Sequence, residues 1–485
     1  MLRFILNDKL IETELPSGST VLDFVRYHKR LAGTKIGCRE GDCGACTILV
    51  GDFENLPAGR QGNKLVYRSM TSCLMPLGIA HGKHIVSVEG VNLPAGRQGI
   101  KELSPVQQAM VDTNGTQCGF CTIGFVMSLT GFVLNETTKQ YDQAIAAIDG
   151  NICRCTGYKS IERAAAILSE KINEKPEQET IAWLVEQKFI PDYFLQIKNR
   201  LKQLREKINT ASTALNPVVQ KLILGGGTDL IVQKALIVKK SEVEHLFDTS
   251  HLQEIKFENE QCYIGAAVTV TALAESKLIQ GFFPHLQQYI KLISSTPIRN
   301  MATMAGNLVN ASPIGDMSIF FLALDSDIVL NKNGAVRTIK LKNFYKGYKQ
   351  IDKAEDEIIE KIIFTPPQNN HFNFEKVSKR THLDIASVNS ACQIQINNDG
   401  VIENIHLSAG GVAPFPKYLK DTAIFLKGRI INTENLKAAI EIMNKEIAPI
   451  SDARGTADYK RLLLRQLFLA HFKNEKDLIK KVIGI

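Results

Sequence analysis

Residues 37–47 read GCREGDCGACT and place Cys38, Cys43 and Cys46 in a glycine-rich C-x4-C-x2-C pattern. With Cys73 further along the chain as a fourth ligand, this is the spacing of a plant-type [2Fe–2S] cluster. Thiolates are soft, anionic donors that suit iron, and the glycines let the backbone wrap closely around a bulky cluster. A four-cysteine zinc site is the alternative, although zinc sites favour paired C-x2–4-C spacings. The stretch therefore predicts an iron–sulfur loop.

A second set of cysteines follows with a different spacing. Cys118 and Cys121 form C-x2-C, and Cys153 and Cys155 form C-x-C. Taken alone, four such thiols fit zinc as well as iron. The predicted first cluster favours iron over zinc for this second set, because a one-electron carrier needs a second redox centre within tunnelling distance. We therefore predict two [2Fe–2S] clusters.

The composition and charge of the chain argue against a nucleic-acid-binding protein and against a membrane-spanning protein. Eight of the ten cysteines lie in the first 155 residues, and Cys262 and Cys392 stand alone in apolar contexts typical of core strands. The net charge of +8 is spread over 485 residues without a dense basic stretch, which argues against nucleic acid. No apolar run approaches the ~18–20 residues of a membrane span, and the N-terminus lacks a signal-peptide pattern. We expect a reducing, cytoplasmic location, where clustered cysteines indicate metal before disulfides.

Periodicity and turn residues predict a multidomain α+β chain. The N-terminal stretch alternates apolar and polar residues, and a helical texture begins at Ser104-Pro105, an N-cap followed by proline at the first helical position. A polar, proline-containing segment then separates these parts from a region that alternates helices and strands. The predicted divisions are 1–90 for the first cysteine set, 91–172 for the helical second set, 173–205 for a connecting segment, 206–370 for a glycine-loop domain and 371–485 for a C-terminal α+β domain.

A glycine loop and a polar segment are candidates for binding a nucleotide. In KLILGGGTDL (221–230) an apolar strand runs into three glycines, whose N–H groups can approach a phosphate, with Thr228 as a hydroxyl donor. The loop matches neither the dinucleotide fingerprint nor the Walker pattern, so by itself it can equally be a turn. Residues 300–316 could supply further donors to a pyrophosphate or ribityl chain. Asp316 could instead cap the following helix.

The octapeptide NLPAGRQG occurs twice, at 55–62 and at 92–99. A repeated basic loop could be a docking site, but a duplicated insertion in two surface loops is the simpler interpretation, because added loop length costs little. The first copy lies between Cys46 and Cys73, so it lengthens that loop without removing a ligand.

Together these motifs resemble one family. GCREGDCGACT, QCGFCTIGF (117–125) and GNICRCTGY (150–158) resemble the iron–sulfur part of the molybdenum hydroxylases. GGGTDL, IRNMATMAGN and ASPIGD resemble their FAD-binding part, and SAGGVAPFP (408–416) and SDARGTADYKR (451–461) resemble their C-terminal flavoprotein domain. The resemblance covers nearly all of the chain. It implies a β-grasp [2Fe–2S] ferredoxin domain, a helical [2Fe–2S] domain, a PCMH-like α+β FAD-binding domain and a C-terminal α+β flavoprotein domain.

The resemblance also implies roles for individual residues. Cys38, Cys43, Cys46 and Cys73 would hold the cluster nearer the flavin, and the second set would hold the cluster nearer the molybdenum cofactor. Gln117 would hydrogen-bond the pterin of that cofactor in a partner subunit. No residue of this chain is expected to act on the substrate. The positions implied for FAD are Leu222, Ile223, Leu224, Gly225, Gly226, Gly227, Thr228, Asp229, Thr303, Met304, Ala305, Gly306, Asn307, Asp316, Ile359 and Lys376.

By resemblance, a molybdenum centre in a large partner subunit hydroxylates a purine, xanthine or hypoxanthine. Electrons then pass through both clusters to FAD and on to NAD⁺ or O₂, in a heterotetramer or larger assembly. Relatives acting on aldehydes, N-heteroaromatics or carbon monoxide are the alternatives, together with a molybdenum-free flavin–ferredoxin reductase and a zinc-bound assembly factor.

Three positions depart from the family pattern. Ile123 replaces a usual proline, Ala305 replaces a usual glycine, and Ile293 stands where the vertebrate enzymes place a flavin-stacking phenylalanine. At Ala305 we expect the flavin site to accommodate the extra methyl group.

Overall fold

The computed structural model describes residues 1–55, 61–94, 102–135, 139–211, 221–367, 371–380 and 383–472. It divides into two compact units. The N-terminal unit takes in the described residues up to Asp248 together with Ser295–Ala302, and the C-terminal unit takes in Thr249–Ser294 and the described residues from Thr303 onward. The range 206–370, predicted as one FAD-binding domain, therefore contributes to both units.

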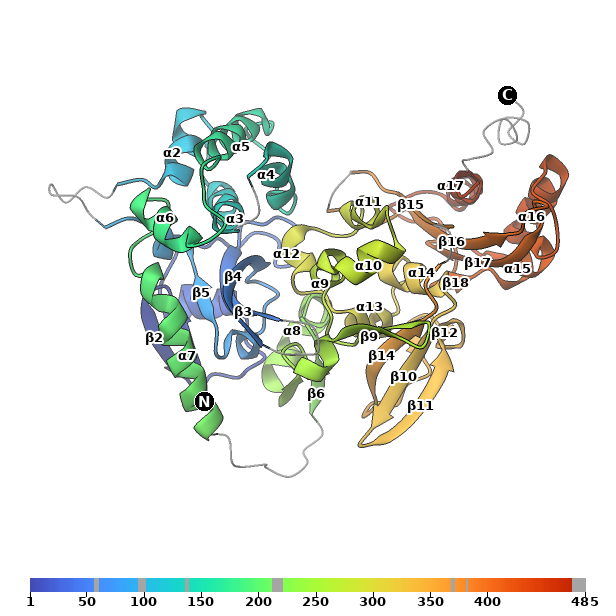
Figure 1. Ribbon diagram of the computed structural model, residues 1–485, viewed down its shortest axis with the longest axis horizontal. Coiled ribbons are helices and arrows are strands. Elements are labelled where there is room, and N and C mark those ends of the chain that lie inside the picture. The colour runs from blue at the N-terminus through green and yellow to red at the C-terminus, as the bar shows by residue number, and fades with distance from the viewer. Residues whose placement is uncertain are drawn as a thin grey trace. The chain divides into compact units, whose positions relative to one another are not determined.

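A five-stranded mixed sheet begins the N-terminal unit, shown in blue in Figure 1. Its order is β2-β1-β5-β3-β4, with β1 parallel to β5 and antiparallel to β2. The strands are β1 (Leu2–Leu6), β2 (Lys9–Thr13), β3 (Thr47–Asn55), β4 (Gln61–Thr71) and β5 (His84–Val86). Thr47 pairs with Thr71, so Cys46 and Cys73 lie just outside the same end of the β3–β4 pair. The strand register thus brings together two cysteines that are distant in sequence.

The helix that begins at Val21 is short and irregular. Thr20 caps α1 (Val21–Asp23) by accepting a hydrogen bond from the Asp23 N–H at 3.2 Å, and a π-helical turn continues over Phe24–His28. A π-turn of this kind often marks a local functional constraint. Here the chain leaves it directly toward the first cysteine loop.

Helices surround the second cysteine set, as predicted. They are α2 (Pro105–Asp112), α3 (Thr122–Leu134), α4 (Tyr141–Ala147) and α5 (Lys159–Lys171). Ser104 and Gln107 form a reciprocal capping box at the start of α2, with proline at the first helical position. Ile123, which departs from the expected proline, lies in the first turn of α3.

The connecting segment predicted at 173–205 is helical. It contains α6 (Thr180–Glu186) and most of α7 (Phe194–Ala211). Ile197, Leu201 and Leu204 of α7 are buried against Ile5 and Phe53 of the sheet, so this segment belongs to the core of the N-terminal unit. The amphipathic spacing of these three residues was the available sequence signal.

A strand–helix–strand element completes the N-terminal unit. The strands β6 (Leu222–Leu224) and β7 (Val243–His245) are parallel and are joined by α8 (Leu230–Lys240), which is kinked at Lys234. Leu224, Ile231 and Met301 are buried in the same core as the first cysteine set. Met301 follows α12 (Thr296–Arg299), shown in yellow beside the blue β4 in Figure 1.

The C-terminal unit contains two main sheets. The first, in order β11-β10-β14-β9-β8, consists of β8 (Ile255–Glu258), β9 (Gln261–Gly265), β10 (Asp327–Lys332), β11 (Ala335–Lys340) and β14 (Ile358–Phe364). The second is β15 (Phe372–Val377), β16 (Val388–Ile396), β17 (Ile402–Gly410) and β18 (Lys417–Tyr418), and a small pair is β12 (Tyr345–Gly347) with β13 (Gln350–Ile351). The helices are α9 (Val270–Glu275), α10 (Lys277–Phe282), α11 (Leu286–Lys291), α13 (Met304–Asn310), α14 (Asp316–Leu322), α15 (Lys420–Leu426), α16 (Thr433–Glu446) and α17 (Ala457–Ala470).

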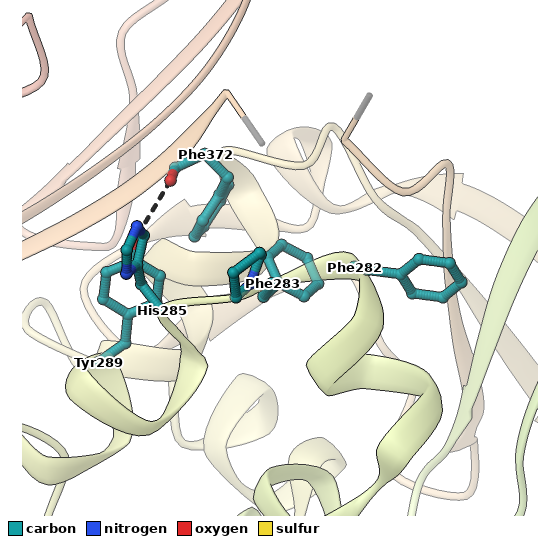
Figure 2. A pocket seen from close by; sticks show the side chains of 6 residues that line it. Phe282, Phe283, His285, Tyr289 and Phe372 are labelled. Atoms are coloured by element: carbon teal, nitrogen blue, oxygen red, sulfur yellow. Dashed lines mark hydrogen bonds between the residues drawn. The ribbon is translucent and has the colours of Figure 1, made fainter. Parts of the chain in front are cut away.

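An aromatic cluster lies where α10 and α11 meet β15 (Figure 2). Phe283 packs edge-on to Phe372, and the Tyr289 hydroxyl donates to the Phe372 carbonyl at 2.9 Å. The cavity there measures about 10 Å³, which is room for about one water, so it is core packing and not a ligand site.

Two sequence features are only partly described. Residues 56–60 and 95–99 make up most of the two NLPAGRQG copies and are outside the described residues. The prediction that both copies are surface loops therefore stays a prediction. Among the helices that the structure describes, none has the length and apolar character needed to cross a membrane.

Candidate iron–sulfur centres and flavin-binding loops

The first cysteine set is gathered at one end of the N-terminal sheet as two pairs of thiols. Cys38 and Cys43 lie within hydrogen-bonding reach of each other, and so do Cys46 and Cys73. Hydrogen bonding with Cys43 lowers the pKa of Cys38 to about 5, and hydrogen bonding with Cys73 lowers the pKa of Cys46. The same hydrogen bonds raise the pKa of Cys43 and of Cys73, so each pair of thiols shares one proton, which binding of a metal to both sulfurs would displace.

The second cysteine set also forms two pairs, and they cross between the motifs. The sulfurs of Cys118 and Cys155 are 3.7 Å apart, and Cys121 lies within hydrogen-bonding reach of Cys153. Each pair thus takes one cysteine from C-x2-C and one from C-x-C. Cys118 and Cys155 are exposed, whereas Cys153 is buried.

Pairing distinguishes a two-iron cluster from a zinc site. Among the described residues, the eight thiols lie as pairs and not as a group of three or more metal-binding side chains around one point. Two pairs of thiols suit a cluster of two irons held by four cysteines. All ten cysteines are free thiols. Both sets therefore fit the predicted [2Fe–2S] clusters.

Backbone N–H groups point at the sulfurs of both sets. The N–H groups of Cys38 and Glu40 donate to Cys43 Sγ at 3.5 Å and to Cys38 Sγ at 3.3 Å. In the second set, the Thr156 N–H and hydroxyl donate to Cys153 Sγ at 3.4 and 3.1 Å. Such bonds stabilise the anionic form of the ligands and tune the potential of a bound cluster.

The two cysteine loops are in direct contact. The N–H of Ile152, which precedes Cys153, donates to the Cys43 carbonyl at 3.1 Å. Asn151 donates to the Gly44 carbonyl at 3.2 Å. Gly44 has φ +68°, and a Cβ there would lie 2.3 Å from the Gly150 carbonyl oxygen, so only glycine allows this approach. Asn151 stands inside the GNICRC motif, and its contact with the first loop was not predicted from the sequence.

The predicted phosphate loop lies between β6 and α8 of the N-terminal unit. Helical hydrogen bonding starts with the Ile231 N–H donating to the Gly227 carbonyl, so the amides just before Ile231 are free of the helix. The N-terminus of α8 and these amides favour an anion. Asp229 does not cap the helix and instead accepts from the Gln233 side chain at 2.8 Å.

The same loop rests on the first cysteine set. Gly227 has φ +81°, and a Cβ there would lie 2.8 Å from the carbonyl oxygen of Leu74, the residue after Cys73. A Cβ at Gly226 would lie 1.7 Å from the Met301 carbonyl oxygen, so no other residue fits at that position. The loop predicted to hold FAD phosphates is thus in contact with the chain that carries Cys73.

The remaining predicted flavin contacts belong to the C-terminal unit. Thr303 caps α13, accepting from the Gly306 N–H at 3.2 Å, and Asn307 accepts from the Ser318 N–H at 3.1 Å. Met304 is buried, and the Ala305 N–H donates to the Ala266 carbonyl at 3.1 Å. These residues form a compact helix start whose side chains are largely engaged within the unit.

Asp316 and Lys376 are brought together. The Lys376 ammonium donates to Asp316 Oδ2 at 2.8 Å and to the Leu292 carbonyl at 2.6 Å, and its side chain is only 1% exposed. Asn389 donates to Asp316 Oδ1 at 2.6 Å, a contact that the sequence analysis did not foresee. Asp316 therefore does not cap α14, which was the alternative role. The Ile359 side chain is buried in β14.

Comparison with known proteins places these sites in a family. Four family models match: the 2Fe-2S iron-sulfur cluster binding domain over 4–77, the [2Fe-2S] binding domain over 88–166, the FAD binding domain in molybdopterin dehydrogenase over 203–367, and the CO dehydrogenase flavoprotein C-terminal domain over 374–474. The chain belongs to the molybdenum hydroxylases. It is the iron–sulfur and FAD part of this family of oxidoreductases. The predicted multidomain α+β fold is confirmed.

Curated relatives of this molybdenum hydroxylase chain are longer proteins. Xanthine dehydrogenase from Emericella nidulans is 28% identical, over 88% of this chain and 35% of its own length. Xanthine dehydrogenase 1 from Arabidopsis thaliana is 26% identical, over 94% of this chain and 38% of its own length, and the xanthine dehydrogenase/oxidase of Rattus norvegicus is 25% identical over 97% and 38%. This molybdenum hydroxylase chain thus spans less than two fifths of each.

Solved structures overlap about half of this molybdenum hydroxylase chain. Quinoline 2-oxidoreductase from Pseudomonas putida 86 covers 54% of it and 90% of the solved chain, at a TM-score of 0.48 and 20% identity. Carbon monoxide dehydrogenase from Hydrogenophaga pseudoflava covers 52% of it and 88% of the solved chain, at a TM-score of 0.49 and 24% identity.

Proposed function

We propose that this chain is the electron-transfer subunit of a xanthine dehydrogenase. Its order of motifs, iron–sulfur first and then FAD, resembles the small subunit of bacterial xanthine dehydrogenase. Electrons from a molybdenum centre in a large partner subunit would pass through the two clusters to FAD and on to NAD⁺ or O₂, in the cytoplasm and within purine catabolism. The assembly would be a heterotetramer or larger.

The observation that carries this proposal is the continuous contact of three loops in the N-terminal unit. Cys153 is joined to Cys43 through the Ile152 N–H, and the flavin loop touches Leu74 beside Cys73. The protein thus supplies a short route from the second cysteine set to the first and then to the flavin loop. A zinc-bound structural protein would not need the two cysteine loops and the glycine loop to be in contact one after another.

The surface of the second set supports a partner subunit. Cys118 and Cys155 are exposed, with Gln117 beside them, and the rings of Phe120 and Tyr158 are 46% and 37% exposed. Exposed aromatic side chains around a redox site are typical of an interface. We infer that Gln117 faces the pterin of the molybdenum cofactor across it.

The residues of this chain hold and insulate the cofactors. When bound, the clusters carry single electrons and FAD combines two of them into a hydride for NAD⁺. The eight cysteine thiolates hold iron, and the amides at Cys38, Glu40 and Thr156 tune their charge. The glycine loop before α8 would hold the FAD phosphates. In the C-terminal unit, Lys376 and Asn389 donate to the two carboxylate oxygens of Asp316, a predicted FAD contact, and so fix its orientation.

The choice of a purine substrate is supported by the relatives, since the three reported above are named xanthine dehydrogenases. The substrate pocket would lie in the partner subunit, so the residues of this chain do not select among purines, aldehydes, N-heteroaromatics and carbon monoxide.

The test is to isolate the native complex through a tag on this chain and to measure metals, flavin and activity. We expect a large partner subunit, molybdenum, two distinct [2Fe–2S] EPR signals, FAD, and xanthine-dependent reduction of NAD⁺. Oxidation of an aldehyde, an N-heteroaromatic or carbon monoxide in place of xanthine would contradict the proposal that the substrate is a purine. Absence of both molybdenum and a large partner would favour a flavin–ferredoxin reductase, and zinc in place of iron would indicate an assembly factor.

A pair of cysteine variants tests whether electrons pass through the second cysteine set. Cys118→Ala should abolish xanthine-dependent NAD⁺ reduction by removing a ligand of the exposed set. Cys392→Ala removes a buried core thiol of the C-terminal unit and should leave that activity in place.

A further inference from the structure

Residues 295–302 leave their neighbours in sequence and fold with the N-terminal unit. They lie inside the stretch that matches the FAD-binding family model, residues 203–367. Asn300 donates to the Ser69 carbonyl of β4 at 2.8 Å, and Met301 is fully buried in the core of the first cysteine set. Figure 1 shows α12, from this segment, beside β4. We call residues 295–302 the bridge segment.

Asp149 anchors the bridge segment to the helical part of the unit. It follows α4, and its side chain is 5% exposed. Its carboxylate accepts from the Thr296 N–H at 2.7 Å and from the Arg299 guanidinium at 2.6 Å. Thr296 is the first residue of α12, so Asp149 satisfies a helix N-terminus that is 147 residues away in sequence.

The residues after Asp149 lead directly into the second cysteine set. Gly150 packs against the Pro297 ring of the bridge segment. Asn151 and Ile152 then donate to the carbonyls of the first cysteine loop, as described above, and Cys153 follows. Holding Asp149 in place therefore fixes the short segment that carries Cys153 against the loop that carries Cys43.

The other end of the bridge segment touches the first cysteine loop and the flavin loop. Ile298 packs against Gly41, which lies between Cys38 and Cys43. The Met301 carbonyl is the group against which Gly226 of the flavin loop rests. One eight-residue segment thus touches both cysteine loops and the glycine loop, and Asp149 with Arg299 is its buried ionic attachment.

We propose that Asp149, acting through Arg299 and the bridge segment, is a positioning residue that sets the spacing of the two clusters and the flavin loop. This inference rests on the proposed electron-transfer function. With both clusters bound, a single electron would pass from one to the other, so that the donor is oxidised and the acceptor reduced by one electron with no bond made or broken. The rate of such a step depends on spacing, and Asp149 controls that spacing without touching a cluster.

The proposal is tested by a variant that removes the negative charge of Asp149. Asp149→Asn keeps the shape of the side chain but removes the negative charge that faces Arg299, which weakens the bonds to Thr296 and Arg299. We expect transfer between flavin and clusters to slow by at least about tenfold, because small displacements of aligned groups have large effects on rate. Asp149→Glu, which keeps the carboxylate, should restore part of the rate.

The experiment uses the full chain loaded with iron–sulfur clusters and FAD. Flash photoreduction of the flavin, followed by cluster bleaching, measures the transfer rate, and EPR of the fully reduced chain measures the magnetic coupling between the clusters. Glu102→Gln is the matched control, since its ion pair with Lys188 at 2.9 Å is exposed and lies in the same unit. We expect Asp149→Asn to alter coupling and rate with iron and FAD unchanged, and Glu102→Gln to alter neither.

Wild-type coupling and rate in a folded, fully loaded Asp149→Asn chain would overturn the proposal. If that variant does not fold, Arg299→Gln takes its place, because Asp149 then keeps the Thr296 N–H. A folded Arg299→Gln chain with wild-type coupling and rate would overturn the proposal equally. Neither measurement needs molybdenum, a partner subunit or NAD⁺, so failure of this inference is distinct from failure of the proposed function.

Discussion

The two cysteine sets use the same ligands but differ in exposure: Cys38 and Cys43 are the more open members of the first set and are half-buried, whereas Cys118 and Cys155 of the second are exposed. In the first, Cys46 and Cys73 are 2% and 3% exposed, and the set is bordered by the second set on one side and by the flavin loop on the other. In the second, Cys118 and Cys155 open to the surface of the unit. The difference indicates a direction: the exposed set suits exchange with another molecule, and the buried set suits transfer within the chain.

The largest expected effect is the loss of a ligand from each set. Cys46→Ala and Cys118→Ala should each abolish one [2Fe–2S] EPR signal and leave the other. Only Cys46→Ala also opens a cavity in the core, so we expect it to lower the free energy of unfolding by about 1–3 kcal/mol more than Cys118→Ala. Iron content, EPR and urea unfolding measure these effects. Equal destabilisation by both variants would contradict the contrast between buried and exposed sets.

Gly226→Ala tests whether the first set, and not the second, borders the flavin. An added Cβ would lie 1.7 Å from the Met301 carbonyl oxygen, so the loop must move at a cost of about 1–3 kcal/mol. We expect loss of FAD and a changed EPR signal of the first cluster with the second unchanged. Gly281→Ala is the control, because a Cβ there meets open space. Retention of FAD at wild-type affinity would argue against the assigned phosphate loop.

Low pH should destabilise the surroundings of the first cysteine set before those of the second, because of His84. Burial lowers the pKa of His84 to about 3, and its ring accepts from Tyr67 and donates to the Asn7 carbonyl. Since an unfolded histidine takes up a proton below pH ~6.5, stability falls as pH drops from ~6.5 toward 3, by about 2 kcal/mol at pH 5. Residues 102–172 contain no histidine. We expect acid to weaken the first cluster before the second.

His84→Gln isolates this effect. The variant should be less stable at pH 7 but should show a flatter loss of stability between pH 6.5 and 5, measured by urea unfolding of the iron-loaded chain. An unchanged pH dependence would exclude His84 as the titrating group.

The smallest expected effect concerns Tyr158. Its hydroxyl accepts from the Cys153 N–H at 3.1 Å, and the side chain is partly exposed. Tyr158→Phe should cost about 1 kcal/mol of stability and shift the potential of the second cluster alone. Redox titration followed by EPR of both clusters measures the shift, and movement of the first potential would show that the sets are less separate than their surroundings indicate.

The sequence predicts the local parts of this molecule well. The helical character predicted for 91–172 is local in this sense: Ser104 and Gln107, which cap α2 reciprocally, stand three residues apart. The spacing of the cysteines within each motif is local too, so it can be read from the sequence, and their role as cluster ligands stays a prediction. The pairing of Cys118 with Cys155 is set by the fold, and no short-range pattern indicates it.

Long-range contacts were the part that the sequence analysis missed. Asp149 and Thr296 are 147 residues apart, and neither belongs to a recognisable ligand motif, so their hydrogen bond leaves no periodic signal. The helical connecting segment was missed for a related reason: α7 is amphipathic, but the face that it buries is defined by the sheet of another part of the chain. The Asp316–Lys376–Asn389 group likewise combines three separate elements.

The bridge segment also bears on how the protein is made. A ribosome that has just completed the second cysteine set must still add about 150 residues before Arg299 can reach Asp149. At roughly 5–20 residues per second, this interval is on the order of 8–30 s. During that time both sets of thiols are present while the segment that holds their loops together is absent. The nascent chain therefore passes through a period in which the cysteines are open to cluster delivery, or to oxidation, before the bridge segment closes over them.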